Sequence, residues 1–333
     1  MNHDRAKSID VHCHLVRFAS DGFLHPSFQN SIKVRTYLRN VGINTFSQWL
    51  GVQKQLSGES LDVLYTQQLQ AHIETSDISH VVVLALDGAY DAQGNLDKDK
   101  TLWYVSNDAV IKLAQRSPKI LAGGSINPMR RDWEDELEKC IENRVALIKW
   151  LPNVMGFDPK NPKFLAFYKR LADEQIPLLS HVGFEYAVSV ADHHYADLEK
   201  LTLPLETGVK VIAAHCCGGR PIIDNGKMFQ EVVDFSKRHE NFYMDVSAMA
   251  SVHRRSRLRN CLRNDITRER LVYGTDYPIP VHRWAFGDKL GVEEAIRKER
   301  NPLDSDVQVK RAMGVDDKIL ARGYRLINPS TLL

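Results

Sequence analysis

The feature that most constrains the fold is a short apolar run that recurs along the chain and is each time followed by a segment of helical periodicity. From the second run onward the spacing is about 25 to 40 residues, close to the roughly 30 residues of a strand–helix–strand unit. Buried strands that alternate with amphipathic helices are typical of a parallel sheet covered by helices, and eight such units close a (β/α)8 TIM barrel. The sequence therefore predicts an α/β barrel, whose strands we expect at residues 9–15, 81–86, 120–126, 146–151, 177–182, 209–214, 242–246 and 271–274.

The whole chain, residues 1–333, is interpreted as a single barrel domain with two additions. The first interval between runs is too long for one helix, which leaves an extra segment, 16–60, rich in aromatic residues and interleaved with arginines. Because the loops after barrel strands form the active-site face, this segment is either a substrate cap or a small subdomain with its own apolar cluster. Residues 301–333 are expected to form a helical extension packed on the outside of the barrel.

Composition excludes several classes of protein. Apolar residues make up 43% and charged residues 26%, which is ordinary for a globular protein, and the net charge of +2 does not favour nucleic acid as a partner. No apolar run approaches the ~18 residues that span a bilayer, so no membrane partner is expected, and no signal peptide precedes the first run. Five cysteines, an odd number with two adjacent, favour reduced thiols and a cytoplasmic location. The expected partner is a small-molecule substrate.

Two histidines in the first run are the first candidates for metal binding. His12 and His14 are alternate residues of a predicted strand, so their side chains share one face, while Cys13 points to the other. Asp10 is expected to share the histidine face and to form hydrogen bonds behind it. An H-x-H pair alone is a weak signal in a chain with thirteen histidines.

Polar side chains at the ends of other runs strengthen that signal. His181 ends the fifth run, His215 follows the sixth, Asp276 follows the eighth and Lys149 lies within the fourth. The carboxyl ends of all strands in a parallel barrel open on one face, so these side chains are predicted to converge. Imidazole and carboxylate ligands suit zinc first, with manganese, iron or cobalt as alternatives.

The set His12-x-His14, Lys149, His181, His215 and Gly274-Thr275-Asp276-Tyr277-Pro278 resembles the amidohydrolase superfamily. More narrowly, it looks like the branch of metal-dependent TIM-barrel hydrolases that includes aminocarboxymuconate-semialdehyde decarboxylase. The resemblance covers essentially the whole chain, from Ile9 to the terminal helix.

The resemblance implies roles for these residues. The metal ligands would be His12, His14, His181 and Asp276, around one divalent ion rather than two. Asp276 would also take a proton from water. His215 would be either a ligand of a second metal or the acid/base of a one-metal site, and the catalytic pair would then be His215 and Asp276.

Three further residues are candidates for substrate binding. Lys149 would be carbamylated in binuclear relatives, but the one-metal branch favours a free amine that binds a substrate carboxylate; residue parity alone leaves its direction open. Trp150 and Arg220 are the other two candidates. Dimers are common in the resembling branch, where a neighbouring subunit can contribute an arginine, so a homodimer is an open expectation by analogy.

The function expected from this set is hydrolysis of a small organic amide, ester or lactone that bears a carboxylate, with a metal-activated water as the nucleophile. A metal-dependent non-oxidative decarboxylase of an aromatic or muconate-like acid is the alternative, because the same residues can serve either reaction. A third interpretation is a barrel that keeps its metal without catalysis.

Overall fold

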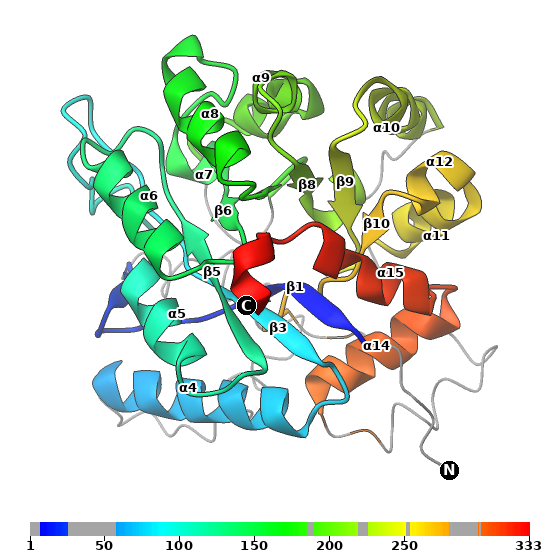
Figure 1. The fold of residues 1–333 in the computed structure, drawn as a ribbon, viewed down its shortest axis with the longest axis horizontal. Helices are drawn as coiled ribbons and strands as arrows, with labels where there is room; N and C mark the ends of the chain where they lie inside the picture. Colours follow the sequence, from blue (N-terminus) through cyan, green and yellow to red (C-terminus); the bar gives the residue numbers. More distant parts are fainter. Residues whose placement is uncertain are drawn as a thin grey trace.

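The computed structural model describes residues 7–25, 58–185, 190–218, 226–250, 254–279, 281, 299 and 301–333. Its centre is a sheet of eight parallel strands in the order β1-β3-β5-β6-β7-β8-β9-β10 (Figure 1). These strands are β1 (Ile9–His14), β3 (His80–Leu84), β5 (Ile120–Ser125), β6 (Ile148–Trp150), β7 (Leu178–Ser180), β8 (Val211–Ala213), β9 (Phe242–Asp245) and β10 (Leu271–Val272). Each falls within, or one residue beyond, a predicted apolar run, so all eight predicted strands are confirmed.

The sheet closes where its last strand meets its first. The Val11 N–H donates to the Tyr273 carbonyl at 3.1 Å, and the Asp276 N–H donates to the His12 carbonyl at 2.7 Å. A parallel bridge between Cys13 and Tyr277 continues this contact. The fold is therefore the predicted (β/α)8 barrel.

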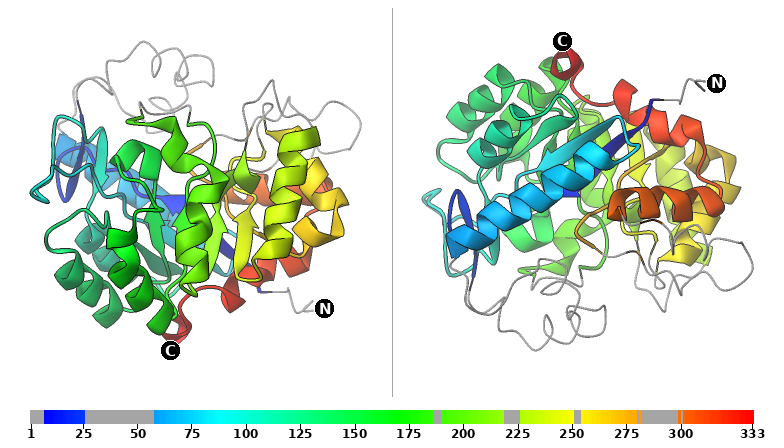
Figure 2. Two further views of the ribbon diagram at one scale, coloured as in Figure 1. Left: turned by 90° about the horizontal axis from the view of Figure 1, so that it is seen from above. Right: turned by 90° about the horizontal axis from the view of Figure 1, so that it is seen from below.

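Helices surround the sheet, as the periodicity predicted (Figure 2). Their local sequences explain where they begin: Ser106 accepts a hydrogen bond from the Ala109 N–H ahead of α5, and Asp316 accepts one from the Ile319 N–H ahead of α15. The helices are α4 (Gly58–Thr75), α5 (Asn107–Ala114), α6 (Trp133–Glu142), α7 (Pro152–Met155), α8 (Leu165–Asp173), α9 (Thr202–Glu206), α10 (Gly226–Arg238), α11 (Arg255–Arg263), α12 (Asp265–Arg268), α14 (Pro302–Ala312) and α15 (Asp317–Arg322).

Apolar side chains on the inner faces of the strands fill the lower part of the barrel. One buried cluster draws members from β1, β3, β5, β7, β8 and β10, including Ile9, Val82, Leu179, Ile212 and Val272. A cluster shared by strands from all round a closed sheet lies inside it, whereas the larger cluster lies between the sheet and the helices. The polar residues described below lie above this apolar plug, at the carboxyl ends of the strands.

One feature of the first loops differs from the expectation. Gly22–Leu24 forms β2, which pairs antiparallel with β4 (Trp103–Val105). Three-residue strands carry too little alternation to be recognised in a sequence. Residues 26–57, most of the expected cap, lie outside the described residues. Within the described part of the chain, no helix combines the length and apolar character needed to cross a bilayer.

Candidate metal centre

Three side-chain atoms of the kinds that bind metals converge at the seam where the barrel closes. His12 Nε2 lies 3.1 Å from His14 Nε2, and Asp276 Oδ1 lies 3.3 Å from the former and 3.4 Å from the latter. All three side chains are buried. Asp276 adopts a left-handed backbone conformation, with φ of 65°, while its N–H is bonded to the His12 carbonyl. The main chain of the seam thus brings the carboxylate to the two imidazoles.

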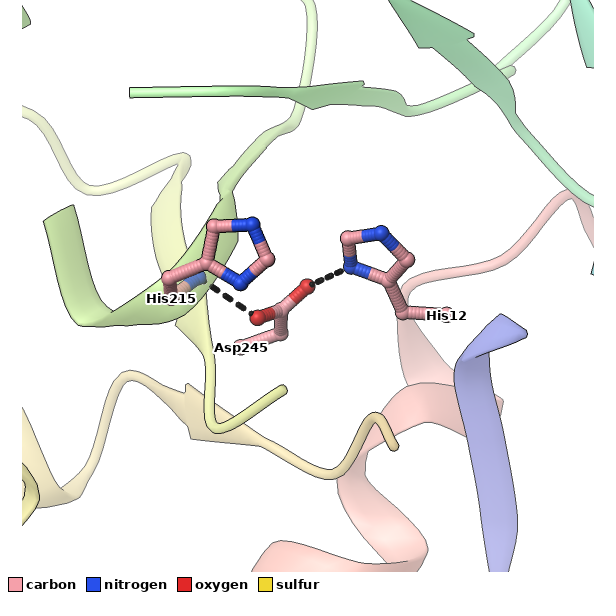
Figure 3. A group of neighbouring side chains, drawn as sticks. All are labelled: His12, His215 and Asp245. Atoms are coloured by element: carbon pink, nitrogen blue, oxygen red, sulfur yellow. Dashed lines mark hydrogen bonds and ion pairs between the residues drawn. The ribbon is translucent and has the colours of Figure 1, made fainter. Parts of the chain in front are cut away.

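Asp245, at the end of β9, orients His12 from behind (Figure 3). Its Oδ2 lies 2.7 Å from His12 Nδ1, an interaction in which the ring nitrogen donates. Its Oδ1 accepts the His215 N–H at 2.8 Å, the Ser247 N–H at 3.0 Å and the Ser247 hydroxyl. A carboxylate with this many donors holds a ligand rather than acting as one, and it leaves the lone pair of His12 on Nε2.

The environment keeps Asp245 and Asp276 ionised. Burial raises the pKa of each carboxyl, but the adjacent His12 outweighs it, together with His215 and Ser247 for Asp245 and with His14 for Asp276, so that both pKa values fall below the usual range. Sequence reasoning missed Asp245, although it ends a predicted strand in the same way as the residues that were chosen.

His215 lies beside this trio on a strained turn. It follows β8 with φ of 59°, and Cys216 and Cys217 continue the left-handed conformation at 50° and 55°. Left-handed non-glycine residues cost about 1–3 kcal/mol each and cluster at functional sites. The His215 ring stacks on that of His12 at 5.4 Å, and its Nδ1 lies 3.8 Å from Asp276 Oδ2.

Hydrogen bonding determines which nitrogen of His215 carries the proton. Its Nδ1 lies 2.8 Å from the Ser247 hydroxyl oxygen and 3.2 Å from the Ser247 carbonyl oxygen. The hydroxyl proton of Ser247 is donated to Asp245, so Nδ1 must be the donor to Ser247. Burial lowers the pKa of His215 well below its usual value. The ring is therefore neutral near pH 7, with its lone pair on Nε2.

His181 lies next to His215 but outside the tight trio. Its ring centroid is 5.4 Å from that of His215, and its Nδ1 lies 3.6 Å from Glu185 Oε2. Its Nε2 is buried and has no hydrogen-bond partner in the described structure. Burial lowers the pKa of His181 well below its usual value, so this nitrogen offers a lone pair with nothing to receive it.

The donor set fits a divalent cation. Two imidazole nitrogens and a carboxylate oxygen converge, and the buried Nδ1 of His14 and Nε2 of His181 have no hydrogen-bond partner in the described structure, which is the combination of donor atoms that zinc and similar cations bind. The same His12 also belongs to a second compact group with His215 and Asp245, but the donors already bonded to Asp245 make the group with His14 and Asp276 the better metal site.

Two cations lie near the predicted ligands. Lys149 lies in register with Leu179, an interior residue, so its buried side chain points into the barrel. Burial lowers its pKa to about 8, while Asp245 and Asp276 act in the opposite direction. Arg254, just before α11, is a charge that the sequence analysis missed; it contributes to the lowered pKa values of His181 and His215.

The other predicted substrate residues do not join this group. The Trp150 side chain is fully buried on the outer side of β6, where its ring contacts those of Phe157 at 5.0 Å and Tyr168 at 5.9 Å. The tryptophan that the structure does bring to the site is Trp103, whose ring lies 5.2 Å from that of His14. Arg220 lies outside the described residues.

Asp10 also differs from its expected place. A β-bulge between Asp10 and Cys13 breaks the alternation of side chains along β1. Asp10 forms the expected hydrogen bonds behind the histidines, with the backbone N–H groups of His12 and Thr275, but its register partner is Val81, a residue of the outer cluster, so Asp10 does not share the histidine face.

Comparisons with known proteins bear on the fold and the family. Among the solved structures that share the fold are the following two. One is an uncharacterised TIM-barrel protein from Bordetella bronchiseptica, at 16% identity and a TM-score of 0.54 over 93% of this chain and 100% of that chain. The other, from Pseudomonas putida and provisionally described as a 2-pyrone-4,6-dicarboxylic acid hydrolase, is 13% identical with a TM-score of 0.54 over 96% and 97%. No curated protein matches. Because the family model described as Amidohydrolase matches residues 9–316, the chain belongs to the amidohydrolase family and is an enzyme of that superfamily.

Proposed function

We propose that the protein is a metal-dependent hydrolase that cleaves an amide, ester or lactone in a small substrate bearing a carboxylate. The observation that carries this proposal is the convergence of His12 Nε2, His14 Nε2 and Asp276 Oδ1 within 3.1 to 3.4 Å of one another. We assign these three as ligands of one divalent cation, zinc first, with His181 as the fourth. Such a cation would lower the pKa of bound water towards about 7 and would polarise a carbonyl group.

The residues around the ligands are suited to moving a proton. Asp276 is ionised and can accept a proton from the attacking water through Oδ2, the oxygen that faces His215. His215 is neutral and carries its proton on Nδ1, so Nε2 can take a proton and then donate it to the leaving group. Ser247 and Asp245 hold this ring in the tautomer that the role requires.

Lys149 supports the choice of a substrate with a carboxylate. With a pKa of about 8 it is mostly protonated at neutral pH, and it is a buried cation on the interior face of β6. A buried cation is favourable only near negative charge, which Asp245, Asp276 and a substrate carboxylate would provide together. The P. putida protein's provisional description names a lactone that carries two carboxylates, so such lactones belong in the substrate panel.

The test is to assay one panel before chelation, after chelation and after reloading with zinc. Carboxylate-bearing lactones, esters and amides would be followed by proton release, and aromatic and muconate-like acids by release of carbon dioxide. We expect hydrolysis that is lost on chelation and restored by zinc. Carbon dioxide release without hydrolysis would establish the decarboxylase alternative, and retained metal without turnover would favour the non-catalytic barrel.

A further inference from the structure

Helix α14 packs outside the barrel, beside α4 (Figure 2). One of its charged side chains, that of Lys310, nevertheless contacts the seam. Lys310 is 0% exposed. Its Nζ donates to the Gly274 carbonyl at 2.7 Å and lies 2.5 Å from Asp306 Oδ1 on the same helix. Lysine is almost never fully buried unless its charge is paired, so this position needs an explanation beyond the packing of a helix.

The peptide that Lys310 holds lies directly against the candidate metal centre. A Cβ atom at Gly274 would lie 2.8 Å from the Cβ of His12, 3.3 Å from that of Ser247 and 3.6 Å from that of Asp245. Only glycine lets the backbone come this close. Gly274 is also two residues before Asp276, so movement of its carbonyl would displace the carboxylate.

A second anchor holds the same segment from the other side. The Thr275 N–H and hydroxyl donate to Asp10 at 3.0 and 2.6 Å, and Asp10 also accepts the His12 N–H at 2.9 Å. The Tyr273 hydroxyl donates to Asp306 at 2.9 Å. Lys310 is therefore the cation of a buried network that contains two carboxyl groups and joins α14 to β1 and to the segment after β10.

We propose that Lys310 is a positioning residue of the metal centre. By holding the Gly274 carbonyl, it fixes the backbone of residues 274–276 so that Asp276 Oδ1 faces His12 and His14. The inference rests on the proposed metal site. It means that α14, a helix outside the barrel, contributes a residue that positions one of the proposed ligands.

Binding of Co²⁺ alone, measured by calorimetry and by the visible absorption of the bound ion, tests this proposal without a substrate. In Lys310→Met the apolar stem is kept and the charge and donor are removed. We expect this variant to bind Co²⁺ about 10 to 100-fold more weakly than the wild type and to show a changed spectrum at saturation. The matched control is Val309→Ala, a fully buried residue of the same helix, which should lower stability and leave affinity and spectrum unchanged.

Asp306→Asn keeps the proposal testable if Lys310→Met does not fold. This change removes the charge partner of Lys310 with little change in shape, and we expect a smaller weakening of Co²⁺ binding in the same direction. Folded network variants that bind Co²⁺ as tightly as Val309→Ala, with the wild-type spectrum, would overturn the positioning role alone. A wild-type protein that binds no Co²⁺ would overturn the proposed metal site itself, and the positioning role with it.

Discussion

Among the buried polar clusters that the described residues form at the carboxyl ends of the strands, two differ in how their hydrogen bonds are satisfied. The first is the metal centre; the second, which we call the Asp87 network, consists of Asp87, Tyr90, Asn127 and Arg130. Asp87 accepts the Tyr90 hydroxyl at 2.8 Å, the Asn127 N–H at 2.7 Å and the Arg130 guanidinium at 3.3 Å. The Asn127 amide donates to the carbonyls of Gly88 and Met155. Donors and acceptors are matched within this network.

The metal centre leaves polar atoms without partners. His12 Nε2, His14 Nε2 and Asp276 Oδ1 lie within 3.1 to 3.4 Å of one another, and the buried Nδ1 of His14 and Nε2 of His181 have no hydrogen-bond partner in the described structure. Burial and charge are common to both clusters, so neither property identifies a site. The difference teaches that a functional cluster is recognised by buried polar atoms that have no hydrogen-bond partner in the protein and need a bound metal ion or substrate to satisfy them.

The largest effect that separates the two clusters is expected in catalysis. Asp276→Asn removes the charge that accepts a proton and should lower kcat/KM by about 10²–10⁴-fold, whereas Asp87→Asn should change it little. Steady-state assays on the hydrolysed substrate, with metal content measured in parallel, check this. Equal losses in the two variants would show that the Asp87 network is also functional.

The next effect is a loss of stability, and we expect it from a change in the Asp87 network. Asp87→Ala leaves the Arg130 guanidinium, still near Asp132 and Glu136, without its most buried partner, at a cost of about 3 kcal/mol in the free energy of unfolding. Urea denaturation measures this loss. Metal content should stay at the wild-type level. Loss of metal from this variant would show that the Asp87 network and the metal centre are not separate in function.

Metal removal should destabilise only proteins with an intact metal centre. At a free metal concentration 100 times Kd, binding stabilises the folded state by about 2.7 kcal/mol. Chelation should therefore lower Tm in the wild type and in Asp87→Asn, but leave it nearly unchanged in Asp276→Asn. Thermal scans with and without a chelator compare the three proteins. A wild-type Tm that does not change when the chelator is added would contradict the proposed metal site.

The strands and the grouping of most candidate ligands followed from the sequence because their signal is local. An apolar run predicts a buried strand, and a parallel barrel brings the ends of all its strands together, so His12, His14 and Asp276 could be grouped without coordinates. The same rule selects Asp87, three residues beyond β3, and Asp245, at the end of β9. Their separate roles depend on partners distant in sequence, which composition and spacing do not encode.

Other features depend on backbone details that a pattern cannot show. The bulge in β1 changed the direction of Asp10, since residue parity assumes a regular strand. The left-handed turn from His215 to Cys217 contains no glycine, so it carried no sequence signal. Trp150 and Lys149 are adjacent on one strand and face opposite sides, and only the register showed which of them points inward.

The smallest expected effect is a difference in how the two clusters respond to pH. Burial lowers the pKa of His14 from 6.5 to about 4, so the unfolded chain takes up a proton first as the pH falls. The stability that neutral His14 contributes is complete above pH 6.5 and is lost towards pH 4, by up to about 1.4 kcal/mol per pH unit. Burial instead raises the pKa of Asp87 above 3.8, so its contribution is present at low pH and is lost as the pH rises.

Urea denaturation of the metal-free wild type, His14→Gln and Asp87→Asn at pH 7 and pH 5 separates these contributions. Between pH 7 and pH 5 the wild type should lose more stability than His14→Gln, because the variant lacks the histidine that resists protonation. As the pH falls further towards 3.8, the wild type should gain stability relative to Asp87→Asn, because burial raises the pKa of Asp87. If His14→Gln follows the wild type at both pH values, the imidazole is not held neutral in the metal-free site, and its lone pair is not reserved for a cation as the comparison requires.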